Sequence, residues 1–145
     1  MSDTLKICGL TIDRGQKLRT YLPVPDTHVK IPITIINGTE DGKTLLITAG
    51  IHGGEYPGIA AAMELGRDIE PEHVRGCLIM MHPVNIQGFW ARREMIVPED
   101  GKNLNRVFPG DPLGTLADKT AYLISSNFFP IADFYVDMHS GDIHE

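Results

Sequence analysis

The stretch from residue 44 to residue 82 constrains the fold of this 145-residue chain more than any other part of the sequence. Residues 44–49 (TLLITA) form a short apolar run, typical of a strand that is covered on both faces of a sheet. Residues 57–69 then place apolar side chains at helical spacing, with Pro57 suited to a first turn. Residues 75–82 (RGCLIMMH) form a second apolar run of strand length. The order strand, helix, strand indicates a right-handed crossover between parallel strands, and therefore an α/β fold.

Three further elements are predicted on either side of this unit. Residues 29–36 (VKIPITII) are rich in β-branched side chains, which predicts a strand, and Pro32 places that strand near a sheet edge. Residues 115–129 predict a helix and residues 134–138 a last strand. The core-facing side of the helix over 57–69 is expected to carry Ile59, Ala62, Met63, Leu65, Gly66 and Ile69.

A long irregular stretch, residues 83–113, separates the second apolar strand from the later helix. It is rich in glycine, proline, asparagine and arginine, and loops of this length in a compact domain usually serve a site. The strands that end at Ala49, His82 and Met138 are followed by glycine, histidine and polar residues. Ligands of open α/β sheets bind beyond such carboxyl ends, so we expect the functional residues there.

Composition narrows the class of protein. A formal charge of −6 argues against a nucleic-acid or anionic membrane surface, because phosphate binding depends on clustered Lys and Arg. The N-terminus lacks the pattern of a secretory signal, and no apolar run approaches the length of a membrane span, so the cytoplasm is the expected location. Cys8 and Cys77 are too few and too far apart for a disulfide framework, and are expected to be buried free thiols.

His52, Glu55 and His139 are the candidate metal ligands. His52 and Glu55 lie three residues apart where a glycine loop turns into a helix, a spacing that lets an imidazole and a carboxylate converge on one ion. His139 follows the last strand, among small polar residues able to orient it. Two histidines and one glutamate suit a single Zn²⁺ ion and leave a fourth position for water, as catalytic zinc sites do.

Two other interpretations apply to the same residues. A His-x-x-Glu pair often arises by chance, and only the loop position and the remote histidine raise this pair above that background. Gly50, Gly53 and Gly54 could instead form a phosphate-binding turn at a helix N-terminus. Their spacing matches neither the dinucleotide nor the P-loop fingerprint, and Glu55 would repel a phosphate.

Three segments together resemble the succinylglutamate desuccinylase and aspartoacylase family, relatives of the zinc carboxypeptidases. They are AGIHGGEYPG (49–58), GKNLNRVFPG (101–110) and VDMHSGD (136–142), in the family's order. The resemblance implies zinc bound by His52, Glu55 and His139. It also implies a mixed, mostly parallel sheet flanked by helices, as in zinc carboxypeptidases and the phosphorylase/hydrolase-like fold. On this basis residues 1–28 would be an N-terminal extension and residues 29–145 the N-terminal part of the catalytic domain.

The resemblance also implies roles for residues of the long loop. Asn105 and Arg106 match the pair that holds the substrate's carboxylate, and a guanidinium gives bidentate hydrogen bonds to such a group. Arg92 and Arg93 compete for the role of the arginine that polarises the scissile carbonyl, with Arg93 slightly preferred. For an average arginine a solvated surface charge is the ordinary interpretation. The implied substrate is a small N-acyl amino acid or related amide that bears a carboxylate.

The sequence departs from the family pattern in two places. Asn103 stands where relatives commonly have an aspartate that accepts a hydrogen bond from a ligating histidine. The family's general-base glutamate lies well downstream of the third ligand, whereas this chain stops six residues after His139. Glu145 is expected to be a terminal charge rather than that base. A truncated catalytic domain is therefore expected. A carboxypeptidase acting on short peptides and a non-catalytic metal-binding module remain as alternatives.

The remaining candidates are given structural roles. Phe89 and Trp90 could line a pocket, but a place in the core is the preferred expectation, and His28, His73 and His82 are interpreted as structural. His144 stays ambiguous, because it lies beside the chain terminus. A last strand close to the terminus could leave a sheet edge uncovered and allow pairing with a second copy, and the sequence does not specify the oligomeric state.

Overall fold

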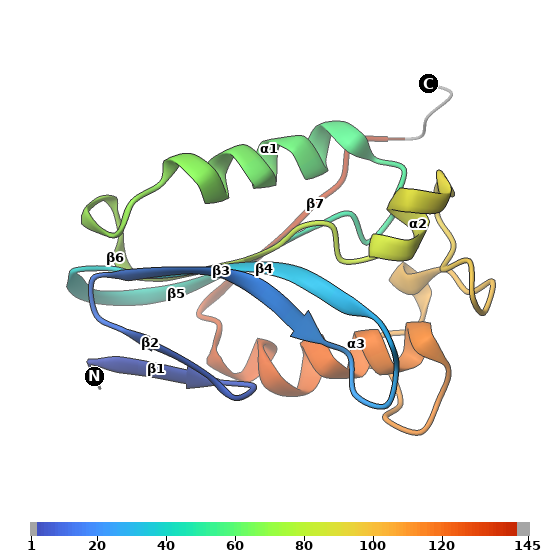
Figure 1. Ribbon diagram of the computed structural model, residues 1–145, viewed down its shortest axis with the longest axis horizontal. Helices are drawn as coiled ribbons and strands as arrows, with labels where there is room; N and C mark the ends of the chain where they lie inside the picture. The colour runs from blue at the N-terminus through green and yellow to red at the C-terminus, as the bar shows by residue number, and fades with distance from the viewer. Residues whose placement is uncertain (1–2, 142–145) are drawn as a thin grey trace.

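A computed structural model describes residues 3–141 of the chain. Its centre is a five-stranded sheet in the order β3, β4, β6, β5, β7 (Figure 1). The strands of this sheet are β3 (Gln16–Pro23), β4 (Lys30–Asn37), β5 (Glu40–Ala49), β6 (Arg75–Met81) and β7 (Phe134–Met138). Strand β5 pairs in parallel with both β6 and β7, whereas β4 pairs antiparallel with β3 and β6. The predicted mixed sheet is confirmed, but this even division does not confirm a mostly parallel one.

Helices cover both faces of the sheet. Helix α1 (Tyr56–Asp68) lies along one face and α3 (Leu116–Asn127) along the other (Figure 1). Both begin and end within two residues of the predicted helices, and an α/β fold is confirmed. The remaining elements are the hairpin of β1 (Thr4–Ile7) and β2 (Leu10–Asp13), the short helix α2 (Ile86–Ala91), and 3-10 turns over Pro71–His73, Leu104–Arg106 and Phe129–Ile131.

The strands divide their apolar side chains between the two faces. On β6, Ile79 belongs to the larger cluster, which includes residues of α3, whereas Met80 belongs to a smaller cluster on the opposite face. On β5, Leu46 and Ile47 divide in the same way. Successive side chains of a strand point to opposite faces, and here both faces are covered. The two apolar segments of the sequence therefore do not alternate between apolar and polar residues.

The place of β4 in the sheet and the buried face of α1 can be compared with the expectations. Strand β4 lies next to β3, an edge strand of the described sheet that pairs along its whole length, including Tyr21 opposite Pro32, so the expected place near a sheet edge is confirmed. The sequence interpretation did not anticipate β3, which comes from the predicted N-terminal extension. On α1, Met63 and Leu65 are 45% and 39% exposed, so the buried face is narrower than predicted. The buried face of α1 also includes Gly58, which was not among the residues expected on that face.

Strand β7 forms an edge of the described sheet, as expected. Its residues Phe134, Tyr135 and Val136 are exposed. The start of β7 is fixed by Asp133, whose carboxylate accepts hydrogen bonds from the Thr44 backbone N–H at 2.8 Å and from Lys43 Nζ at 2.7 Å. No helix among residues 3–141 is long and apolar enough to cross a membrane.

The two cysteines and several histidines can now be placed. Both cysteines are free, and Cys77 is buried as expected, but Cys8 is only half-buried. Burial raises the pKa of the Cys77 thiol to about 12. His82 is buried against Thr34, with 3.1 Å between its Nε2 and Thr34 Oγ1, whereas His28 is exposed. His144 and Glu145 lie outside the described residues.

Candidate metal centre

The loop between β5 and α1 carries two of the predicted ligands. Gly50 begins it with a φ of +71°, a left-handed conformation that favours glycine. A Cβ added at Gly53 would lie 2.4 Å from the Phe89 backbone nitrogen, so only glycine allows this loop to pack against α2. Glu55 then forms the N-cap position of α1. The predicted route from strand through glycine loop to helix is therefore present.

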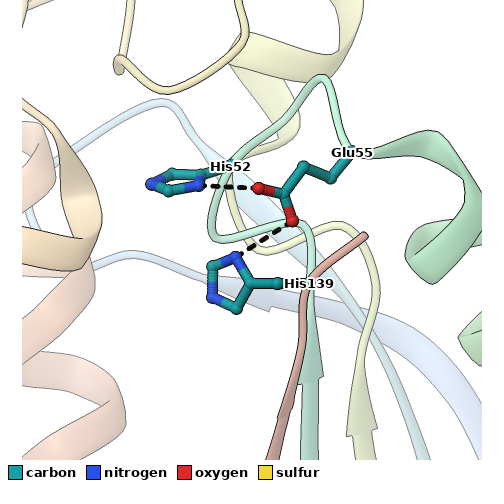
Figure 2. Close-up of side chains that lie close together, drawn as sticks. All are labelled: His52, Glu55 and His139. Carbon is teal, nitrogen blue, oxygen red and sulfur yellow. Dashed lines mark hydrogen bonds and ion pairs between the residues drawn. The ribbon is translucent and has the colours of Figure 1, made fainter. Parts of the chain in front are cut away.

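His52, Glu55 and His139 come together at the carboxyl ends of β5 and β7 (Figure 2). The Glu55 carboxylate lies between the two imidazoles, with Oε1 2.9 Å from His52 Nδ1 and Oε2 2.9 Å from His139 Nδ1. One ligand atom from each residue lies within 4.8 Å of the other two. The structure thus brings the remote His139 beside the neighbouring pair His52 and Glu55.

Each histidine is anchored through its other ring nitrogen. His52 Nε2 lies 3.1 Å from Asn103 Oδ1, and His139 Nε2 lies 2.8 Å from Asp137 Oδ2. Asn103 Oδ1 also accepts the backbone N–H of Asn105 at 2.9 Å, which identifies it as the acceptor. Because both Nε2 atoms face acceptors, both Nδ1 lone pairs can turn toward a shared ion.

The site's titratable groups are tightly linked. Burial alone would raise the pKa of Glu55, but hydrogen bonds from His52, the Ser140 backbone N–H and His139 lower it below its ordinary value. Burial alone would lower the pKa of His139, but Asp137 and Glu55 together raise it. The lowered pKa keeps the Glu55 carboxylate ionised beside the two histidines. A metal site needs this charged form of Glu55.

The donor set fits zinc. Two imidazole nitrogens and one carboxylate are ligands that Zn²⁺ accepts, and three protein ligands are the number found at catalytic zinc sites. His52 and Glu55 are each 9% exposed, so these two donors are held in place by surrounding structure. Outer partners that fix the tautomer of each histidine are a regular feature of such sites.

The loop that supplies Asn103 is fastened to α3. Asp100 Oδ2 accepts the backbone N–H of Ala117 at 2.8 Å, and Lys102 forms an ion pair with Asp118. That ion pair and the Thr115 backbone N–H lower the pKa of the Asp118 carboxyl. The loop over residues 100–103 is thus bonded to α3 through Asp100 and Lys102, and to the His52 ring through Asn103.

The candidate substrate-binding residues lie in the 3-10 turn that follows Asn103 and at the end of α2. Asn105 is half-buried next to Asn103, and Arg106 is exposed. Arg92 ends α2 in a left-handed conformation with a φ of 52°, and both Arg92 and Arg93 are exposed. Within residues 3–141 none of these three arginines forms an ion pair, so each guanidinium is available to an anion. The structure does not separate Arg92 from Arg93.

Phe89 and Trp90 do not take the preferred place in the core, but the alternative place beside a hollow. Phe89 is half-buried and Trp90 is 75% exposed. With Tyr56 and Arg92 they line an open hollow beside the first turn of α1. The ring centroids of Tyr56 and Phe89 are 5.5 Å apart and those of Phe89 and Trp90 5.1 Å apart, both in edge-on contact.

Two polar residues of the site were not found by sequence reasoning. Thr48 Oγ1 donates to Asp137 Oδ1 at 2.7 Å and lies 2.8 Å from the Tyr135 hydroxyl. Tyr135 as a whole is 43% exposed, but desolvation raises the pKa of its hydroxyl to about 12. A threonine within an apolar strand run is the available signal, but its partner depends on the register between β5 and β7.

The fold agrees with comparisons to known proteins. The model of the succinylglutamate desuccinylase/aspartoacylase catalytic domain matches residues 41–144, and the chain belongs to this family. The match covers all three motif segments and all three candidate ligands.

Individual relatives are deacylases or members of the same family. The chain is 41% identical over 113 residues to N-alpha-acetyl-L-2,4-diaminobutyric acid deacetylase from Halomonas elongata. This aligned segment covers 78% of this chain and 32% of that protein. A succinylglutamate desuccinylase/aspartoacylase from Rhodobacter sphaeroides matches with a TM-score of 0.84 and 36% identity, over 97% of this chain and 44% of that one. The product-bound ectoine utilization protein EutE (DoeB) from Ruegeria pomeroyi matches with a TM-score of 0.84, 34% identity and the same coverage. The chain therefore spans less than half the length of these relatives.

Proposed function

We propose that this chain supplies the zinc ligands of a hydrolase that removes the acyl group from an N-acyl amino acid or a related small amide. The observation that carries the proposal is the position of the Glu55 carboxylate between the Nδ1 atoms of His52 and His139, 2.9 Å from each. Each imidazole is also held from behind, by Asn103 and Asp137. One donor atom from each residue lies within 4.8 Å of the other two, which supports the proposal of a single shared ion.

The chemistry of the proposed reaction divides between the ion and the chain. Bound zinc would polarise the amide carbonyl and acidify a water molecule. Asn105 and Arg106 would hold the substrate's carboxylate, since a guanidinium binds such a group with two parallel hydrogen bonds. Arg92 or Arg93 would stabilise the negative charge that develops on the carbonyl oxygen. All three arginines are exposed and free of ion pairs within residues 3–141, which supports these roles.

The relatives support an acylated amino acid as the substrate. The Halomonas elongata protein is named for the deacetylation of N-alpha-acetyl-L-2,4-diaminobutyric acid, and the Ruegeria pomeroyi protein was solved with product bound. We therefore propose an N-acetyl amino acid with a free carboxylate as the first substrate to test. A zinc carboxypeptidase needs the same carboxylate grip, so short peptides form the comparison set.

A non-catalytic metal-binding module is the second candidate. The carboxylates that bond to the triad within residues 3–141 are Glu55 and Asp137, and histidines engage both of them. Neither is free to take a proton from water in the way that a general base must. Zinc binding without hydrolysis would favour this candidate.

Zinc content of the purified chain tests the ligand set. We expect one ion per wild-type chain and loss of that ion in His139→Ala. His28→Ala is the matched control, since the His28 side chain is 74% exposed and outside the triad. Equal zinc content in wild type and His139→Ala would remove the third ligand and the proposal with it.

Activity is best measured in a chimera, because the chain spans only 32% of the deacetylase. The matching 113-residue segment of the Halomonas elongata enzyme would be replaced by that of this chain. We expect hydrolysis of N-acetyl amino acids and none of short peptides, and loss of activity when Glu55→Gln is added. A zinc-loaded, folded chimera without hydrolysis would favour the non-catalytic module, and preferred cleavage of peptides would favour the carboxypeptidase.

A further inference from the structure

A line of polar side chains runs along β7 toward the metal centre. The line includes every second residue of this segment, namely Tyr135, Asp137 and His139. Side chains alternate along a strand, so the strand residues Tyr135 and Asp137 point to the same face. In the parallel register, Thr48 on β5 lies directly opposite Asp137. Leu46, two residues before Thr48, belongs to the larger core cluster, so these side chains face the side of the sheet that α3 covers.

The direction of each hydrogen bond in this line follows from the donors available. The Thr48 hydroxyl donates its single proton to Asp137 Oδ1 at 2.7 Å, because a carboxylate can only accept. The Tyr135 hydroxyl, 2.8 Å from Thr48 Oγ1, must therefore be the donor in that pair. At the other end, Asp137 Oδ2 lies 2.8 Å from His139 Nε2 and accepts from it.

This polarity has a consequence at the proposed ligand. Both oxygens of Asp137 are fixed, one by Thr48 and the other by His139. A carboxylate held in this way keeps the proton on Nε2 and leaves the Nδ1 lone pair of His139 for an ion. Without the Thr48 hydroxyl, Asp137 loses the bond that fixes its side-chain rotation.

The surroundings of the line show that it is built into the fold. Thr48 is fully buried, and a buried hydroxyl is costly unless it is bonded. The Tyr135 ring packs on Phe129, with centroids 4.9 Å apart, and Phe129 stacks on Phe108 at 6.1 Å. Phe108 belongs to the same family-motif segment as Asn103, so one aromatic stack connects Tyr135 to the loop that anchors His52.

We propose that Thr48 and Tyr135 are positioning residues of the metal centre, which hold the Asp137 carboxylate in the orientation that fixes His139 as a ligand. This inference rests on the proposed zinc site. Neither residue is a proposed ligand; Thr48 acts through Asp137, and Tyr135 acts through Thr48.

The first test compares zinc affinity in matched variants. Thr48→Val keeps the β-branched shape and removes the hydroxyl, and we expect a dissociation constant about 10-fold higher, the lower end of the range for outer partners of metal ligands. Thr48→Ser restores the hydroxyl and should restore the affinity, and Tyr135→Phe should have a smaller effect than Thr48→Val. Thr44→Val makes the same change on the same strand, outside the line, and should bind zinc like wild type. Equal affinity in Thr48→Val and Thr44→Val would overturn the inference.

A double-mutant cycle tests whether Thr48 acts through Asp137. In an Asp137→Ala background, Thr48→Val should leave the dissociation constant unchanged, because the side chain that it orients is gone. The same 10-fold loss in both backgrounds would mean that Thr48 acts in another way, and would contradict the inference.

The zinc-free protein provides a readout that is independent of metal binding. The Nε2 proton of His139, donated to Asp137, should give a downfield NMR signal, which moves in Thr48→Val and stays in Thr44→Val and Thr48→Ser. An unmoved signal in a folded Thr48→Val chain would overturn the inference. If wild type binds no zinc, the proposed function fails, and this spectrum still decides whether Thr48 orients the pair.

Discussion

Asn103 Oδ1 lies 3.1 Å from His52 Nε2 and also accepts the backbone N–H of Asn105 at 2.9 Å. One amide oxygen therefore fixes both the ring of a proposed ligand and the turn that leads to Arg106. The Asn103 amide supplies the acceptor oxygen that orients the ring, but it carries no negative charge.

Asn103→Asp should therefore strengthen zinc binding. A carboxylate in the same position would make the imidazole a more basic ligand, and outer partners of this kind change metal affinity by roughly 10-fold or more. Asn103→Ala should weaken binding by a similar factor. Competition with a chromophoric chelator measures both dissociation constants, and an unchanged affinity in Asn103→Ala would show that this contact does not support the site.

Gly53→Ala should destabilise the fold. The added Cβ would lie 2.4 Å from the Phe89 backbone nitrogen, and backbone atoms cannot move aside as a flexible side chain can. Overpacking of this kind costs about 1–3 kcal/mol of unfolding free energy. Gly101→Ala is the control, since its Cβ meets nothing within 4 Å and costs only the strain of a φ of +70°. Urea unfolding compares the two, and equal stability of Gly53→Ala and wild type would contradict the close packing of this loop.

His82 should make the stability of the chain depend on pH. Burial lowers its pKa below the ordinary value of 6.5, so the folded state favours the neutral ring. The unfolded chain binds a proton as the pH falls through about 6.5, and stability is lost from there down to the lower folded-state pKa. Above pH 6.5 the contribution is fully present. His82→Leu should show a shallower loss of unfolding free energy between about pH 7 and pH 5 than wild type. Parallel pH profiles for the two proteins would contradict this account.

The two thiols should react at different rates. Burial raises the pKa of both, to about 12 for Cys77, and Cys8 is the more exposed of the two. Since the thiolate is the reactive form, both should be slow at neutral pH, and Cys77 should react only when the chain unfolds. Mass spectrometry after timed alkylation of native protein measures each site. Labelling of Cys77 before Cys8 would contradict the predicted order.

The parts of the fold between residues 44 and 82 could be predicted because their signals are local. The strand at 44–49, the glycine loop and the helix that starts near Pro57 each depend on residues close in sequence, and each is present. Strand β3 could not be found in the same way. Its exposed and buried residues do not alternate cleanly, and it becomes a strand by pairing with β4 along eight residues.

The residues of the candidate site also differ in whether a local sequence signal identifies them. His52 and Glu55 share a loop, and His139 follows a predicted strand, so local patterns indicate all three. The partners of Asp137 required the register of β5 against β7, which places Thr48 opposite Asp137 and which no local pattern contains. Trp90 was assigned to the core on the general habit of large apolar side chains, but its position at the end of the short helix α2 leaves it 75% exposed.

Diffraction from a zinc-soaked crystal of this chain, with data at the zinc absorption edge, tests the central claim most directly. We expect one anomalous peak bonded to His52 Nδ1, His139 Nδ1 and the Glu55 carboxylate, with zinc to nitrogen distances of about 2.0–2.1 Å. An ion bound elsewhere, or a triad that keeps its direct Glu55 to histidine contacts with stoichiometric zinc present, would contradict it.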